Sequence, residues 1–550
     1  MTPTTIDAPA ERRPELVGSA PRRRPRWTEL ATTTDHKEVG LLFLGGALTF
    51  LFLAAVTLVL MRLQLVVPEN TLIKPVPFNR LLSIYGATSV WLFGLPIAAA
   101  LLSYIVPLQI GARGMAFPRL HLLSWWLFLA GGVVIYAGLL FTPSEAGTNP
   151  LPPLADRVFL PNNGVDVWIT GVGFATLAFV CLAVNLAVTI RNMRAPGMAY
   201  RRMPPFAWAG AVWSWTMIFI GPVLLAALTM LMIDRHFSGV FFDAGGGGAP
   251  LLWQHFSWIF LSGAYALMLV PAFGAISEIV PTFSRRALPS RNAVAASLIG
   301  IATLTTLAWM QNMYSAPVRL GFLYFAMTMA IAVVIPVGML ILNWLSSLAG
   351  GTVSLRAPML FALGAIGVTT IGLAAELCQS IIPINLQVGN TTDSTASTHY
   401  ALIGGSVFGM FAALYYWFPK MTGRTMGEAL GRASFWALIL GVNVTFLPLA
   451  LAGLAGQPVD VYKYFDVGNL AVYNLISTLG ALILFAGILL TLVNVLLSVR
   501  GGVPVGHDPW GGDSLEWFAL SPPPLHNFDV LPDVRSPNPL RDIREAVGSR

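Results

Sequence analysis

Long apolar stretches alternate with short polar segments along most of this chain. Each stretch is about 20 residues or longer and nearly free of charge, which is enough for a helix to cross a bilayer core of about 30 Å. The stretches cover residues 39–64, 82–106, 121–142, 167–190, 208–233, 253–280, 293–315, 320–348, 358–384, 398–418, 433–456 and 470–498. The pattern therefore predicts an all-α, polytopic integral membrane protein with about 12 transmembrane helices.

The composition supports the same class. Only 10% of the 550 residues are charged and 56% are hydrophobic, whereas about a quarter of the residues are charged in soluble proteins. An ordinary soluble protein is therefore excluded. Cys181 and Cys378 both fall inside predicted spans, so no disulfide framework is expected.

Lysine and arginine are distributed unevenly over the loops. If the N-terminus is cytoplasmic, the internal loops on its side hold 13 of these residues and the opposite loops hold 6. The positive-inside rule then places both termini in the cytoplasm. The net charge of +7 and the cluster Arg22–Arg26 fit an anionic lipid surface, and they need no nucleic-acid partner.

The chain divides into three segments. Residues 1–35 are rich in Pro and Arg and lack the apolar core of a signal peptide, so we expect a disordered basic cytoplasmic tail. Residues 36–500 form the transmembrane domain, and residues 501–550 form a cytoplasmic C-terminal tail.

Long motifs occur in the span ends and polar loops. Residues 33–40 read T-T-D-H-K-E-V-G, and residues 107–120 read P-L-Q-I-G-A-R-G-M-A-F-P-R-L. Residues 253–280 read W-Q-H-F-S-W-I-F-L-S-G-A-Y-A-L-M-L-V-P-A-F-G-A-I-S-E-I-V, and residues 509–528 read P-W-G-G-D-S-L-E-W-F-A-L-S-P-P-P-L-H-N-F. In order and spacing they resemble subunit I of the heme–copper oxidases, the family of cytochrome c oxidase.

This resemblance covers nearly the whole chain beyond the N-terminal tail. It implies the twelve-helix bundle of oxidase subunit I, a bacterial-type cell (inner) membrane, and other terminal-oxidase subunits as partners. The activity that it implies is oxygen reduction coupled to proton pumping.

The resemblance also implies two hemes and a copper, which six imidazoles hold in the family. The chain has 7 histidines in all, and only His399 stands at one of the six ligand positions. The other five positions hold Tyr85, Ser262, Gln311, Asn312 and Ser397. We therefore predict no copper, no catalytic residue, and either no cofactor or at most one heme.

Groups that support the hemes and the proton routes in the family are replaced as well. The arginine pair for the heme propionates reads Val459-Asp460, and an acidic residue there would repel a propionate. The acidic and basic residues of the two proton routes are replaced by Gly114, Ala264 and Leu340.

Four polar residues within or at the ends of the spans leave interpretations open. His399 could ligate one heme opposite Tyr85 or water, or it could be a hydrogen-bonded interior histidine left from ancestry. Arg62 stands where the family has an arginine beside a heme, but it could also snorkel to the headgroups. Glu376 costs at least about 2.5 kcal/mol in an apolar span, which indicates a partner, water access or a proton path. Glu278, at the end of its span, is expected to be solvated.

Three functions follow from these observations. The first is a non-catalytic subunit I-like protein that acts as a structural or assembly partner in a respiratory complex. The second is an oxidase subunit with residual electron transfer through a single heme on His399. The third is a transporter or channel on the emptied scaffold, with Glu376 and nearby amides lining the path.

Overall fold

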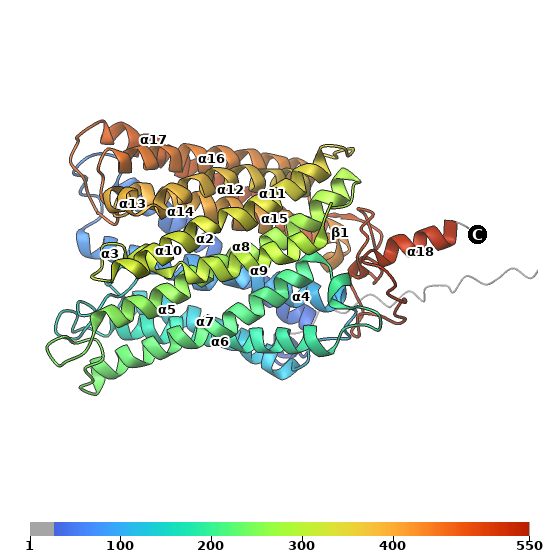
Figure 1. Cartoon of the computed structure of the whole chain (residues 1–550), viewed down its shortest axis with the longest axis horizontal. Coiled ribbons are helices and arrows are strands. Elements are labelled where there is room, and N and C mark those ends of the chain that lie inside the picture. Colours follow the sequence, from blue (N-terminus) through green and yellow to red (C-terminus); the bar gives the residue numbers. More distant parts are fainter. Residues whose placement is uncertain (1–26, 549–550) are drawn as a thin grey trace, which may run out of the picture.

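The computed structural model describes residues 27–548, so the predicted cluster Arg22–Arg26 lies outside the described residues. The long helices lie side by side along one axis, with loops at both ends of the bundle (Figure 1). Twelve helical segments in the described part are long and apolar enough to span a membrane. The all-α polytopic fold is therefore confirmed, and the predicted edges agree with the observed ones within several residues.

Eight spans are uninterrupted helices. They are α2 (His36–Gln64), α5 (Pro118–Phe141), α6 (Gly164–Asn192), α7 (Pro205–His236), α8 (Pro250–Ser284), α12 (Ala357–Ser380), α16 (Glu428–Leu454) and α17 (Leu470–Gly501).

Four spans change their helical geometry along their length. Two contain a wider π-helical turn: α3 (Pro75–Ala87) passes through η1 (Thr88–Gly94) into α4 (Leu95–Gln109), and α14 (Thr392–Leu402) passes through η4 (Ile403–Phe408) into α15 (Gly409–Thr422). The other two are α9 (Arg291–Leu307) followed by the 3-10 turn η3 (Trp309–Met313), and α10 (Leu320–Ala332) followed by α11 (Val334–Leu348).

The remaining elements are short or lie outside the spans. They are α1 (Trp27–Ala31), η2 (Tyr200–Arg202), α13 (Ile382–Val388), β1 (Arg424–Thr425), β2 (Val503–Pro504), η5 (Leu515–Trp517) and α18 (Pro539–Gly548). The strands β1 and β2 pair antiparallel with each other. Within the segment expected to be a disordered tail, residues 27–31 form the helix α1.

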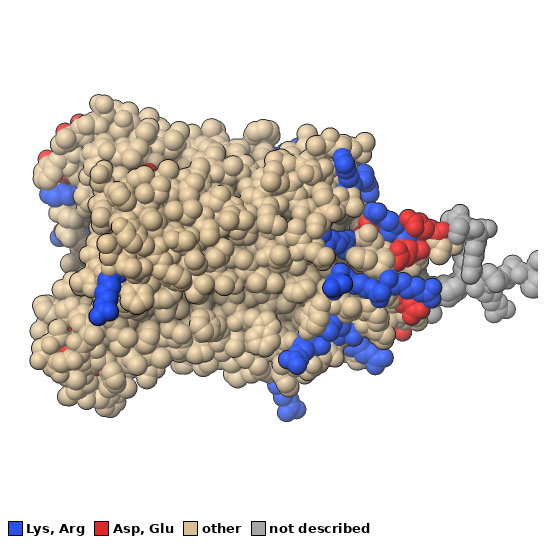
Figure 2. Space-filling view, in the orientation of Figure 1, with Lys and Arg blue, Asp and Glu red and all other residues tan. Residues whose placement is uncertain are grey.

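Charged side chains concentrate at one end of the bundle. Lysine and arginine gather at the end that carries the C-terminus, and the middle of the visible face has almost no charged side chain (Figure 2). We call the end that carries the C-terminus the basic end. An uncharged belt between two polar ends is the surface expected of a protein that spans a bilayer.

Glycines bring two helix backbones into close contact. A Cβ atom added at Gly480 of α17 would lie 2.4 Å from the backbone nitrogen of Thr445 in α16, and one added at Gly441 of α16 would lie 2.6 Å from the backbone of Leu484. Membrane helices have no hydrophobic drive to associate with one another, so close packing of this kind stabilises the pair.

Replacing Gly480 by alanine is expected to lower the free energy of unfolding by about 1–3 kcal/mol, because the added methyl group meets backbone atoms that cannot move aside. The matched control is Gly367→Ala in α12, where an added Cβ has no neighbour within 4 Å and the gain in helix propensity of about 0.5–1 kcal/mol remains. Denaturant titration in detergent measures both variants. Equal unfolding midpoints for the two would contradict the close approach.

The C-terminal segment, residues 501–548, packs against the basic end. Trp510 and Trp517 are buried, and Trp510 Nε1 donates to the carbonyl of Tyr416 in α15 at 2.8 Å. Lys420 Nζ donates to the carbonyl of Ala519 at 2.7 Å. The predicted C-terminal tail is therefore, over its described residues, a folded part of the bundle's end.

Candidate functional site

Tyr85 and His399 meet in the interior of the bundle. Tyr85 lies in the last turn of α3 and His399 lies near the end of α14. Nδ1 of His399 is 2.7 Å from the carbonyl oxygen of Thr395, which only accepts, so Nδ1 carries the hydrogen. Nε2 then accepts from the Tyr85 hydroxyl at 3.0 Å. Phe446 stacks on the imidazole with ring centroids 4.8 Å apart. Both nitrogens and one ring face of His399 are thus engaged by the chain itself.

This contact can be compared with the requirements of a heme. An iron atom between two axial ligands lies about 2 Å from each, as other metals lie from imidazole nitrogen, so the two ligand atoms stand about 4 Å apart. The Tyr85 oxygen and the His399 nitrogen are 3.0 Å apart and hydrogen-bonded. The residues present therefore do not fit a six-coordinate heme at this place.

The four remaining ligand positions are not equivalent in their surroundings. Ser262 of α8 and Ser397 of α14 are buried, whereas Gln311 is half-buried and Asn312 is exposed. The predicted helix 293–315 differs from the structure here, because α9 ends at Leu307 and a 3-10 turn follows. Hydroxyl and amide groups do not replace imidazole as copper ligands. Among residues 27–548, no group of three His, Cys, Asp or Glu side chains could hold a metal.

Arg62 points into the bundle. It is buried, and its Nη2 donates to the backbone oxygen of Asn474 at 3.1 Å and to Asn474 Oδ1 at 3.0 Å, both in α17. The interpretation that Arg62 snorkels to the headgroups is therefore wrong. These two hydrogen bonds join α2 to α17, while Arg62 Nε is buried without a partner among the described residues.

Glu376 has a partner one residue before His399. Its Oε1 accepts from Thr398 Oγ1 at 3.3 Å, and its side chain is half-buried in α12. One turn further along α12, Gln379 Nε2 donates to Asp393 Oδ2 at 2.5 Å. Glu376 and His399 thus belong to one polar region between α12 and α14.

Comparison with known proteins decides the family. The sequence model of the family described as cytochrome C and quinol oxidase polypeptide I matches residues 38–483. The chain belongs to this family. A probable cytochrome c oxidase subunit 1-alpha of Streptomyces avermitilis is 38% identical over 93% of this chain and 89% of its own length. Cytochrome c oxidase subunit 1 of Corynebacterium glutamicum is 36% identical over 97% of this chain and 91% of its own length. Cytochrome c oxidase subunit 1 of Bacillus subtilis is 35% identical over 92% of this chain and 82% of its own length.

A solved structure agrees on the fold. A heme–copper terminal oxidase dimer determined by cryo-electron microscopy superposes on this subunit I-like chain with a TM-score of 0.73 at 13% identity, over 93% of this chain and 89% of that one. At this identity the likeness supports the fold alone. The resemblance and the fold class expected from the sequence are both confirmed.

Sequence reasoning missed the two π-helical turns of this oxidase-family chain. Tyr85 lies just before η1 and His399 lies just before η4, so both axial positions precede a wide turn. Turns of this type are rare and occur frequently at functional sites. A continuous apolar run carries no signal that distinguishes a π-helical turn from an α-helical one.

Sequence reasoning also misplaced Glu278. Its side chain is 7% exposed, so the interpretation that it is solvated is wrong. Its Oε1 accepts from the backbone amide of Phe206 and its Oε2 from Gln109 Nε2, each at 2.8 Å. Gln109 also donates to Glu516 Oε1 at 3.1 Å. The signal for Glu516 was available in the sequence, as a lone carboxylate in the apolar motif L-E-W-F-A-L.

Proposed function

We propose that this chain is a non-catalytic member of the oxidase subunit I family and serves as a structural or assembly partner of other terminal-oxidase subunits in a bacterial cell membrane. The basic end would face the cytoplasm, as the positive-inside rule requires. The chain would carry neither copper nor heme.

The direct hydrogen bond between Tyr85 and His399 carries this proposal. This bond engages Nε2 of His399, the one imidazole left at the family's ligand positions. It also brings the Tyr85 oxygen and this nitrogen to 3.0 Å, which is too close for an iron atom to lie between them. The burial of Ser262 and Ser397, whose hydroxyls are poor copper ligands, supports it further. The well-packed helix bundle supports a role that needs the scaffold rather than the redox chemistry.

The decisive measurement is the cofactor content of the purified chain. After reconstitution with heme, we expect no Soret band in the visible spectrum and no copper by elemental analysis. The matched variant is His399→Ala, which should give the same spectrum as the wild type. A Soret band in the wild type that His399→Ala abolishes would establish the single-heme alternative instead.

The partner assignment needs a separate test. Isolation in mild detergent from the native membrane should recover this chain together with other terminal-oxidase subunits. Recovery of the chain alone would contradict an assembly role. The transport alternative predicts flux in liposomes that Glu376→Gln removes, because Glu376 is a carboxylate within the apolar span α12 that faces α14 through Thr398.

A further inference from the structure

Two carboxylates come together inside the basic end. Glu278 belongs to α8, and Glu516 belongs to η5 in the C-terminal segment. Gln109, the last residue of α4, lies between them, and its Nε2 donates to Glu278 Oε2 at 2.8 Å and to Glu516 Oε1 at 3.1 Å. All three side chains are buried, Glu516 and Gln109 completely. The cluster therefore joins the C-terminal segment to two membrane spans.

The charge of this cluster is not balanced by a direct ion pair. Within residues 27–548, the ion pairs involve other carboxylates. The nearby cations bind elsewhere: Lys420 Nζ donates to the carbonyls of His507 and Ala519, and Arg291 Nη1 donates to the carbonyl of Pro537. Two buried carboxylates without a bound cation are costly, and such groups take up a proton instead.

The cluster has more hydrogen-bond acceptors than donors. The backbone N–H of Phe206 donates to Glu278 Oε1, and Trp417 Nε1 donates to Glu516 Oε1. Oε1 of Gln109 is buried and has no donor within the described residues. A buried acceptor without a donor costs about 1–3 kcal/mol. Glu516 Oε2 is likewise buried without a hydrogen-bond partner among the described residues, and one additional hydrogen on this carboxyl group removes one negative charge.

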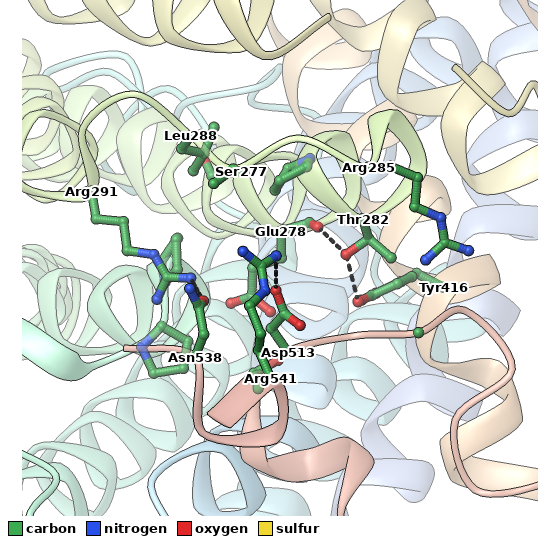
Figure 3. Close-up of a pocket in the computed structure, with 16 residues that line it drawn as sticks. Ser277, Glu278, Thr282, Arg285, Leu288, Arg291, Tyr416, Asp513, Asn538 and Arg541 are labelled. Carbon is green, nitrogen blue, oxygen red and sulfur yellow. Dashed lines mark hydrogen bonds and ion pairs between the residues drawn. The ribbon is translucent and has the colours of Figure 1, made fainter. Parts of the chain in front are cut away.

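A pocket at the basic end borders this cluster at Glu278. Its volume is about 120 Å³, which is room for several water molecules. Its lining includes Glu278, Thr282 and Tyr416 together with Arg285, Arg291 and Arg541 (Figure 3). The Thr282 hydroxyl donates to the carbonyl of Glu278 at 2.7 Å and lies 3.3 Å from the Tyr416 hydroxyl. Glu278 is the member of the cluster that lines the pocket, and water that fills the pocket would exchange protons with it.

We propose that Glu278, Gln109 and Glu516 form a proton-binding site that holds one proton at neutral pH and exchanges it through this pocket. The site couples pH at the basic end to the docking of the C-terminal segment. Loss of the proton would leave two negative charges across the contact between α8 and that segment, and their repulsion would weaken the docking. This site does not depend on the proposed assembly role.

Other titratable groups face the cluster from every element packed on it. Arg291 at the start of α9 interacts with Glu278, and Tyr416 and Lys420 of α15 interact with the carboxylates of the cluster. Around these, Asp508 interacts with Tyr416 and Lys420, His507 with Lys420, and Asp513 and Arg541 with Arg291. Arg285 lines the pocket beside Glu278. Asp508 and Asp513 pair with arginines of α18. A test must therefore report on carboxyl protons, so that a change at Lys420 or His507 is not mistaken for one at the cluster.

The sign of the pH dependence follows from Glu516. Burial raises the pKa of the Glu516 carboxyl above its ordinary value, although hydrogen bonds from Gln109 and Trp417 act in the opposite direction. The folded protein then binds more protons than the unfolded chain between the ordinary pKa of glutamate and the raised one. Stability falls as pH rises through this window and is flat above it. Glu516→Gln should remove its part of this slope in the midpoint of thermal unfolding.

Infrared spectroscopy of the purified full chain tests the bound proton directly. At pH 7, the wild type should show the carbonyl stretch of about one more carboxylic acid per chain than the double variant Glu278→Gln/Glu516→Gln, and this band should shift in D₂O. The matched control, Asp513→Asn at the pocket wall, should retain the band. If the double variant does not fold, each single variant is compared in its place. An unchanged band in the folded variants would overturn the proposal.

The route of exchange is tested by filling the pocket. Leu288 lines the pocket (Figure 3), so Leu288→Trp should slow the deuterium shift of the carboxylic-acid band. The control Leu342→Trp places the same side chain on an exposed face of α11 and should leave the rate unchanged. Equal rates in the two variants would overturn the pocket as the route.

Discussion

Replacing Asp166 by leucine is expected to lower the free energy of unfolding by about 3–5 kcal/mol, because it leaves a buried guanidinium without its counter-charge. The side chain of Arg235 at the end of α7 is completely buried, and its Nε donates to Asp166 Oδ1 at 2.6 Å. Its other nitrogens donate to the carbonyls of Ala155 at 2.5 Å and Asn162 at 2.9 Å. The pair therefore holds the loop between α5 and α6 against α7. Denaturant titration in detergent measures the loss.

An exposed ion pair serves as the control for this prediction. Asp533 and Arg535 form a 3.2 Å contact with side chains that are 80% and 82% exposed, and such pairs contribute little. The Asp533→Asn variant should therefore have the same free energy of unfolding as the wild type. An Asp166→Leu variant as stable as Asp533→Asn would show that Arg235 is solvated when its partner is removed.

Replacing Asn527 by alanine is expected to destabilise the chain by about 2–5 kcal/mol, from backbone strain and lost hydrogen bonds together. Asn527 has φ +67°, which alanine adopts at a cost. Its Nδ2 donates to the carbonyl of Ala112 at 2.8 Å, and its Oδ1 accepts from Lys37 Nζ at 2.9 Å. The side chain thus ties the C-terminal segment to the start of α2 and to the loop after α4.

Glycine at the same position separates the two causes. Asn527→Gly relieves the backbone and loses only the hydrogen bonds, so it should cost about 1–3 kcal/mol. Thermal and denaturant unfolding of both variants give the comparison. Equal losses for alanine and glycine would mean that the positive φ contributes nothing, and no loss in either would contradict the docking of the segment described here.

The spans could be predicted because their signal is local. Length and apolarity alone define a membrane helix, and the predicted span 320–348 coincides with α10 and α11, Leu320–Leu348. The identities at the family's ligand positions could also be read from motifs in the sequence. The resemblance to oxidase subunit I, which the family comparison confirms, depended on those motifs and not on composition.

The direction of each side chain could not be predicted in the same way. Arg62 was placed correctly near the end of its span, but its partner Asn474 lies 412 residues further along the chain. The position of Glu278 at the end of its span predicts a solvated side chain, whereas Gln109 of α4 and Phe206 of α7 donate to its carboxylate. A sequence gives the depth of a residue along a helix, whereas the neighbour that it faces depends on how distant helices pack.

The contact between Tyr85 and His399 could not be predicted from the sequence either. The resemblance to oxidase subunit I places a tyrosine and a histidine at the family's two axial ligand positions, and it leaves open whether His399 holds a heme or a hydrogen bond. Only the arrangement of α3 and α14 within the folded bundle brings the two side chains to 3.0 Å.

The wide turn η1 has a consequence for how this chain tolerates insertions and deletions. Removing one residue from Thr88–Gly94 would let α3 and α4 join as a regular α-helix. Because a π-helical turn takes up one extra residue by widening, Tyr85 would keep nearly the same direction relative to α4, and its hydroxyl would still face His399. A sequence alignment to a relative without the wide turn therefore needs its gap within this turn, since a gap placed before Tyr85 would set the wrong residue opposite His399.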